Sequence, residues 1–309
     1  MRYKILFLTI ILIISSIGTS NAENVIIAVL EQPAFCKEPN INLAVRVLFA
    51  KVDNKWVALD NAEVSKKYDY TKIIWTVAFD GRKIGRIKTS DPNKNIDYDW
   101  AYPRDRLLKV TKDSEIPKIR NFSRIFFSWC DKGPEYRPLV LVSQANFKDP
   151  ETWKIFNPSK EYIDKLFPEL KRIFKKIDLC PNDEPLLAPP LLYDYRTNDK
   201  PLLYDYRTKD LLLFKNYKNA SEQKLISIGI NPSITKCDPI LRDNLFPYWF
   251  VVDNSIRLIG TELALIDAGD YDNDGKSEVI FWHSGYNKDG YTLFYNNFNN
   301  RVDYYWNYH

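Results

Sequence analysis

Short apolar runs separated by turn residues recur along most of the chain. Two pairs of runs predict β-hairpins, because each pair flanks a turn dipeptide, Asp53-Asn54 in the first and Asp80-Gly81 in the second. The predicted strands of the body are residues 45–50, 56–59, 73–79, 84–87, 125–129, 139–143, 211–214, 225–230 and 249–252. The 20 Tyr, 17 Phe and 8 Trp residues also favour sheets. The pattern predicts a mainly β, antiparallel protein.

One stretch departs from this pattern and predicts an amphipathic helical insertion at about residues 159–177. Apolar residues recur there at helical spacing from Tyr162 to Ile177, and Ser159 stands where a helix N-cap is expected. Pro168 predicts a kink or the start of a second helix. The basic residues fall mostly off the apolar stripe. This fits a helix that contacts an anionic surface, or, more simply, a helix packed on the sheet with a solvated basic face.

The last part of the chain, about residues 258–306, is the best-defined unit. Its predicted strands are residues 258–266, 278–283, 290–296 and 301–306. Four consecutive antiparallel strands in about 50 residues have the size of one β-propeller blade. The sequence therefore favours a propeller-like architecture, with this unit as its clearest blade.

The connection between the first two strands of that unit carries the densest chemical signal, Asp270-Tyr271-Asp272-Asn273-Asp274-Gly275-Lys276-Ser277-Glu278. Calcium takes six to eight oxygen ligands, and a short loop supplies them when alternate side chains point inward. Gly275 permits the sharp turn that such a loop needs. The expected ligands are the side chains of Asp270, Asp272, Asp274 and Glu278 and the backbone carbonyl of Lys276.

The spacing of the acids distinguishes between two kinds of calcium loop. An EF-hand requires a Glu at the twelfth loop position, which is Phe281 here, whereas the closing acid, Glu278, comes at the ninth. With apolar runs at residues 263–266 and 279–282, the stretch resembles the β-hairpin calcium loop of FG-GAP/VCBS repeats in integrin-type β-propellers. The resemblance covers one repeat and implies bound Ca²⁺ on a blade hairpin. The alternative is an Asp-rich turn without an ion, which the mutual repulsion of four carboxylates disfavours.

Residues 1–22 have the pattern of a signal peptide. Arg2 and Lys4 form a basic start, an apolar run follows, and Ser20-Asn21-Ala22 provides small residues at the positions that a signal peptidase reads. We expect cleavage after Ala22, which leaves residues 23–309 as a secreted or periplasmic protein. An uncleaved membrane anchor is the alternative, but the apolar run is short for a span of about 20 residues.

The four cysteines, Cys36, Cys130, Cys180 and Cys237, are disulfide candidates in an exported protein. Four cysteines allow three pairings, and the sequential one, Cys36 with Cys130 and Cys180 with Cys237, is the working choice. A tandem duplication, in which residues 190–197 recur as residues 201–208, has a period far below that of a propeller blade. It indicates a local copying event within a Pro-rich connection.

The remaining chemistry favours a binding or structural module over an enzyme. The chain has only two histidines, His283 and His309, and no nucleophile elbow, phosphate loop or paired-histidine motif. With 44 basic and 40 acidic side chains and no long basic stripe, it predicts no nucleic-acid partner, and no second apolar run is long enough to cross a membrane. We expect an extracellular or periplasmic protein or glycan as the partner. A carbohydrate-active hydrolase or lyase on the same scaffold is the alternative.

Overall fold

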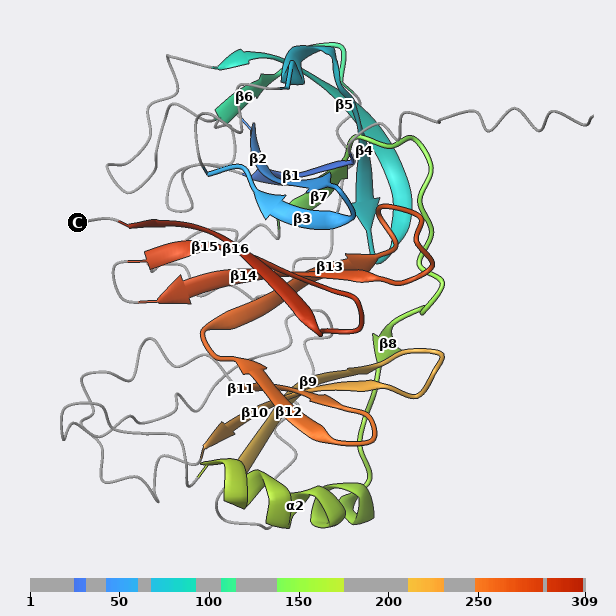
Figure 1. Ribbon diagram of the computed structural model, residues 1–309, viewed down its shortest axis with the longest axis vertical. Coiled ribbons are helices and arrows are strands. Elements are labelled where there is room, and N and C mark those ends of the chain that lie inside the picture. Colours follow the sequence, from blue (N-terminus) through green and yellow to red (C-terminus); the bar gives the residue numbers. More distant parts are fainter. Residues whose placement is uncertain are drawn as a thin grey trace, which may run out of the picture.

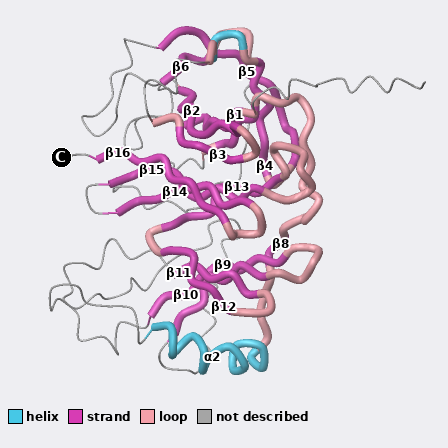
Figure 2. Tube along the Cα trace, viewed as in Figure 1, coloured by secondary structure: helices cyan, strands magenta, loops and turns pink. Residues whose placement is uncertain are grey.

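The computed structural model describes residues 25–31, 43–60, 68–92, 107–114, 138–174, 211–230, 248–285 and 288–307. These residues form three antiparallel β-sheets stacked above a single α-helix (Figure 1). Strands dominate the chain trace in Figure 2. The prediction of a mainly β, antiparallel protein with one helical insertion is confirmed.

The first sheet closes on itself into a barrel of six strands, which forms the ring at the top of Figure 1. Its order is β1-β7-β4-β5-β6-β2, with β2 paired back to β1, and β3 adds a seventh strand beside β2. The strands are β1 (Ile26–Glu31), β2 (Ala44–Val52), β3 (Lys55–Ala58), β4 (Ile74–Phe79), β5 (Arg82–Pro92), β6 (Leu107–Val110) and β7 (Leu139–Val142). Both predicted hairpins lie here, and their turn residues Asp53, Asn54, Asp80 and Gly81 all have positive φ.

The second sheet has five strands in the order β12-β11-β10-β9-β8, and one of its faces is covered by helix α2 (Lys160–Phe174). The strands are β8 (Lys154–Ile155), β9 (Leu211–Lys218), β10 (Lys224–Ile230), β11 (Tyr248–Val252) and β12 (Ile256–Gly260). Ser159 caps the helix, since its Oγ accepts the Tyr162 N–H at 3.2 Å, and the helix continues through Pro168. Ile163, Leu166 and Leu170 pack on the sheet, so the packed-helix interpretation is confirmed.

The third sheet is a four-stranded meander, β13-β14-β15-β16, with the size expected of a blade. Its strands are β13 (Leu263–Gly269), β14 (Glu278–Gly285), β15 (Lys288–Tyr295) and β16 (Asn300–Asn307). The strand predicted at residues 258–266 is in fact divided between two sheets. The chain turns at Thr261-Glu262, where Glu262 has a φ of 57°, so β12 ends the second sheet and β13 begins the third.

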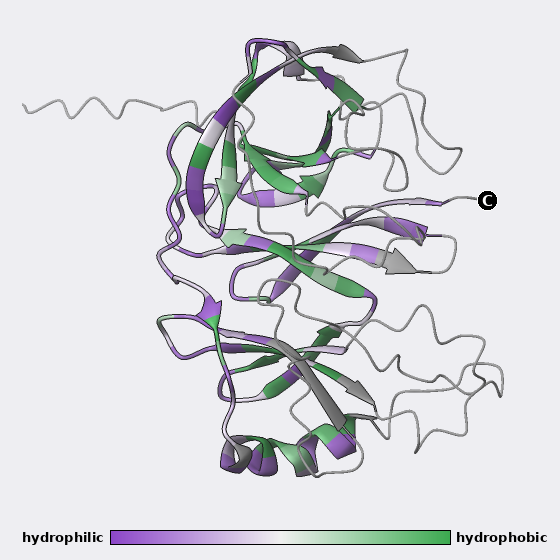
Figure 3. Cartoon of the chain, turned by 180° about the vertical axis from the view of Figure 1, so that it is seen from behind, coloured by the Kyte–Doolittle hydropathy of each residue, from purple (hydrophilic) through white to green (hydrophobic). Residues whose placement is uncertain are grey.

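The four-stranded sheet lies at the centre of the stack. Its side chains point alternately to opposite faces, and both faces are buried against a neighbouring layer. Ile280 and Trp282 pack against the outside of the barrel, whereas Val279 and Phe281 pack against Trp249 of the five-stranded sheet. Two separate hydrophobic clusters fill the barrel interior and the space between α2 and the five-stranded sheet. Figure 3 shows these apolar stretches on the strands of every layer. The three described sheets differ in size and one is closed, so they do not show the repeated blades of a propeller.

Several predicted features lie outside the described residues. These are the signal peptide at 1–22, the four cysteines, the strand at 125–129, the tandem duplication and His309. Within the described part of the chain, no helix has the length and apolar character needed to span a membrane.

Candidate metal centre

The acidic loop joins β13 to β14 at one end of the central sheet. The two strands pair up to Gly269 and Glu278, so the loop between them is held at both ends by sheet hydrogen bonds. Gly275 has a φ of 90°, which L-amino acids with a side chain rarely adopt, and a Cβ added there would meet no atom within 4 Å. The glycine is therefore needed for backbone conformation and not for space.

Three of the predicted ligands converge. Asp270, Asp272 and Glu278 each place one carboxylate oxygen within 4.8 Å of the others, and Asp270 and Glu278 are buried. Oxygens bound to one calcium ion at 2.3–2.6 Å are at most about 5 Å apart. The three residues therefore fit a shared cation, and this acidic cluster is able to hold a metal ion.

Backbone N–H groups already fix the two aspartates. Asp270 accepts from Asp274 and Gly275 at 2.9 and 3.0 Å, and Asp272 accepts from Asp274 at 3.0 Å. Glu278 has less support. Among the described residues, its carboxylate accepts one hydrogen bond, from the Tyr271 N–H at 2.9 Å. A buried carboxylate with one donor leaves much of its charge uncompensated.

The protonation behaviour of the cluster follows from this arrangement. Burial, followed by the charges of Asp272, Asp274 and Asp270, raises the pKa of Glu278 well above its ordinary value. The pKa of Asp270 is also raised, chiefly by burial and then by its carboxylate neighbours, although its backbone hydrogen bonds oppose the shift. Both groups are costly to ionise together, and a bound cation would remove that cost.

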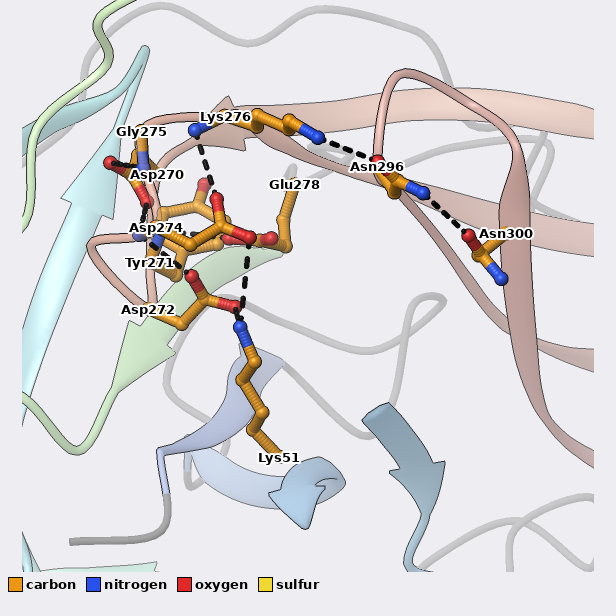
Figure 4. Close-up of polar contacts among 10 residues, drawn as sticks. All are labelled: Lys51, Asp270, Tyr271, Asp272, Asp274, Gly275, Lys276, Glu278, Asn296 and Asn300. Carbon is orange, nitrogen blue, oxygen red and sulfur yellow. Dashed lines mark hydrogen bonds and ion pairs between the residues drawn. The ribbon is translucent and has the colours of Figure 1, made fainter. Parts of the chain in front are cut away.

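One protein cation reaches the cluster from the barrel. The Lys51 ammonium, on β2, forms an ion pair with Asp272 and lies 3.7 Å from an oxygen of Asp274 (Figure 4). The side chains of Lys51 and Asp272 are 17% and 1% exposed, so the pair is largely shielded from water. Burial alone would lower the pKa of Lys51, but the hydrogen bond to Asp272 and the surrounding carboxylates outweigh it and raise the pKa.

The other two predicted ligands take different positions. The Asp274 side chain is 42% exposed, and its Oδ1 accepts the Lys276 N–H at 2.9 Å. It stands beside the three converging carboxylates. The Lys276 side chain leads away from the cluster and donates to Asn296 at 2.7 Å (Figure 4). The backbone carbonyl of Lys276 as a ligand stays a prediction.

The loop is also tied to residues 144–151, which connect the barrel to the five-stranded sheet. Asn273 donates to the Gln144 side chain at 2.5 Å and to the Asn146 carbonyl at 3.0 Å. On the other side of the loop, Ser277 donates its N–H to Glu151 at 3.1 Å and its hydroxyl to Asp149 at 2.9 Å. The loop thus contacts the barrel, the connection and its own sheet.

Sequence reasoning found the acids but missed these anchors. Lys51 lies 221 residues before Asp272 and looks like any lysine in a hairpin strand, and Gln144 and Glu151 belong to no recognisable motif. Comparisons with protein-family models, curated proteins and solved structures found no match to this chain. Function must therefore be argued from the geometry of the site itself.

Proposed function

We propose that this protein is an exported, calcium-stabilised β module that binds a protein or glycan outside the cytoplasm. Calcium is held by Asp270, Asp272 and Glu278, with Asp274 and the Lys276 carbonyl completing the shell. The four-stranded meander serves as a blade-like, calcium-bearing unit of a propeller-like architecture.

The observation that carries this proposal is the Glu278 carboxylate. It is buried, it has one described hydrogen-bond donor, and two other carboxylates each have an oxygen within 4.8 Å of its own. The Lys51 ammonium supplies one positive charge to this group of acids. A hard dication coordinated by oxygen would neutralise the remainder, and all the converging ligands are oxygens.

The role of the ion is structural in this proposal. The loop contacts Lys51 of the barrel and Gln144 and Glu151 of the connection, so its conformation affects how these parts pack. Uncompensated carboxylates would push the loop open and weaken these contacts. Calcium that binds the folded form alone stabilises that form by mass action.

Calcium binding should raise the free energy of unfolding by a measurable amount. Extracellular calcium modules bind with dissociation constants of about 0.1–1 mM, so roughly 10 mM calcium would stabilise the fold by about 2 kcal/mol. For a chain of this size that corresponds to a rise in melting temperature on the order of 5 °C. Thermal melting in chelator and in calcium measures it directly.

Asp272→Ala should abolish the calcium-dependent rise in melting temperature while leaving the far-ultraviolet circular dichroism in excess calcium similar. Asp113→Ala is a matched control, because this exposed acid follows β6 of the barrel and pairs with Lys88, away from the loop. Wild-type protein that melts at the same temperature in chelator and in calcium would show that the loop is only a turn.

A further inference from the structure

A groove of about 960 Å³ lies on the barrel beside the acidic loop. It is lined by Tyr68, which precedes β4, and by Gln144 and Asn146, which follow β7. Asn273 of the acidic loop also lines the groove. Ligand sites have volumes of about 300–1,000 Å³, so the groove is large enough for an oligomeric ligand.

The floor of the groove is the outer face of β4 and β5. Trp75 and Val77 fill the barrel interior, so the alternate residues Ile74 and Thr76 face outward. Arg86 is directly opposite Thr76 in the strand pairing and lines the same groove. Ile74 is 51% exposed, so its apolar side chain is accessible from the groove.

Three charged side chains line the groove, Asp69, Lys72 and Arg86, and Arg86 supplies its net positive charge. Among the described residues no acidic group forms an ion pair with its guanidinium, whereas Lys72, on the groove wall, is paired with Asp69 at 2.8 Å. An exposed guanidinium offers a planar set of donors that fits a carboxylate with two hydrogen bonds. The groove is therefore suited to a ligand that carries carboxylates.

The other lining groups suit a sugar. Gln144, Asn146 and Asn273 have amide side chains, which both donate and accept hydrogen bonds, as sugar hydroxyls do. Asn273 donates its amide hydrogens to Gln144 and to the Asn146 carbonyl, so the groups offered to a sugar are its own Oδ1, the Gln144 N–H donors and the Asn146 side chain. Tyr68 stacks on Tyr70 with ring centroids 6.0 Å apart, and together with Ile74 it offers an apolar surface for the C–H face of a pyranose ring.

The strand pairing argues against an extended peptide. Recognition of a peptide by strand addition requires a free sheet edge, but β4 is hydrogen-bonded to β7 on one side and to β5 on the other. Over Thr76–Ala78 the backbone of β4 is paired on both sides, so the floor presents side chains there, whereas Ile74 and Trp75 are paired with β5 alone.

From these observations we infer that the groove binds an acidic oligosaccharide, with Arg86 on a uronic acid carboxylate and Tyr68 and Ile74 under a sugar ring. The acidic loop holds one wall, because Asn273 is hydrogen-bonded to Gln144 and to the Asn146 carbonyl. The ordering of this wall by calcium rests on the proposed function, whereas sugar binding by the groove stands independently of it.

The test is isothermal titration of the full exported chain with a hyaluronan oligosaccharide and with its carboxyl-reduced form, in calcium and in chelator. Losing a charged hydrogen-bonded pair weakens binding by roughly 10- to 100-fold. We expect a loss of that size for Arg86→Gln and for the reduced oligosaccharide. Arg82→Gln, an exposed arginine on the same strand that does not line the groove, should bind like wild type. In Asn273→Gly the glycine can adopt the positive φ of that position, and the side-chain amide is lost. This variant should bind the oligosaccharide several-fold more weakly.

The outcomes separate the two proposals. No binding by wild type, equal binding by Arg86→Gln and Arg82→Gln, or tighter binding of poly-glutamate of the same charge overturns the groove assignment, the last in favour of an acidic peptide. If calcium raises the melting temperature but the oligosaccharide does not bind, the groove inference alone fails. Arg86-dependent binding without any calcium effect on melting supports the groove and contradicts the calcium proposal.

Discussion

Replacing Lys51 by Met should have opposite effects on the stability of the protein and on its affinity for calcium. The Lys51 ammonium contacts the acidic loop. It forms an ion pair with Asp272 and lies 3.7 Å from a carboxylate oxygen of Asp274. Methionine keeps much of the apolar length of the side chain and removes its charge. In chelator the variant leaves Asp272, which is 1% exposed, without its counter-ion.

The magnitude follows from the burial of the pair. Breaking a fully buried ion pair by removing one partner costs about 3–5 kcal/mol, and an exposed pair contributes about 0–1 kcal/mol. The Lys51 side chain is 17% exposed, so we expect a loss of about 2 kcal/mol in the free energy of unfolding without calcium. Calcium affinity should rise. An ion bound to the same carboxylate lies roughly 5 Å from the ammonium, where even water-like screening leaves over 1 kcal/mol of repulsion, or about a tenfold change in affinity.

Chemical denaturation in chelator measures the first effect, and calcium titration followed by melting temperature measures the second. Lys55→Met is the matched control, since Lys55 lies on the same hairpin, on β3, and is exposed. Equal stability of the two variants in chelator would show that Lys51 contributes no net stabilisation. Weaker calcium binding by Lys51→Met would show that the lysine organises the loop and does not compete with the ion.

Four further predictions follow from the same structure. Gly290→Ala should destabilise the fold by about 3 kcal/mol in urea denaturation, because an added Cβ would lie 2.2 Å from the backbone oxygen of Tyr304. Calcium affinity, measured by titration at several pH values, should fall from about pH 7 to about pH 5, because the raised pKa values of Glu278 and Asp270 mean that protons compete with the ion above the usual carboxylate range. Without calcium, the same shifts should make stability decrease as pH rises through that window. Leu170→Ala should cost about 2–3 kcal/mol by the same denaturation assay, since this buried side chain joins α2 to the five-stranded sheet.

Local features of the fold could be predicted because their signals lie within a few residues of each other. The turns at Asp53-Asn54 and Asp80-Gly81, the Ser159 cap and the acidic spacing from Asp270 to Glu278 are of this kind, and the structure has each element in place. Strand ends were less exact, because pairing with a neighbour decides where a strand stops.

The arrangement of the sheets could not be predicted in this way. Closure of the barrel depends on the pairing of β1 with β2 and β7, and no periodicity within a single strand encodes its neighbours. The sequence around Thr261-Glu262 predicts one long strand, since the residues on both sides are apolar, and it gives no sign that the chain changes sheet there. Lys51 could not be assigned to the site because only the tertiary fold brings it to Asp272.

The position of the acidic loop explains why a weakly bound ion would matter to the whole protein. The central sheet is covered on both faces, with Ile280 and Trp282 against the barrel and Phe281 against Trp249 of the five-stranded sheet. If the loop from Asp270 to Glu278 loses its conformation, the adjoining ends of β13 and β14 are disturbed. The interfaces with the barrel and with the five-stranded sheet both include those strands. Contacts that share one element are lost together, so a few kcal/mol at the loop acts on the stability of the stack and not on one turn. Calcium bound there is therefore expected to stabilise the barrel and the five-stranded sheet, although the ion itself contacts neither.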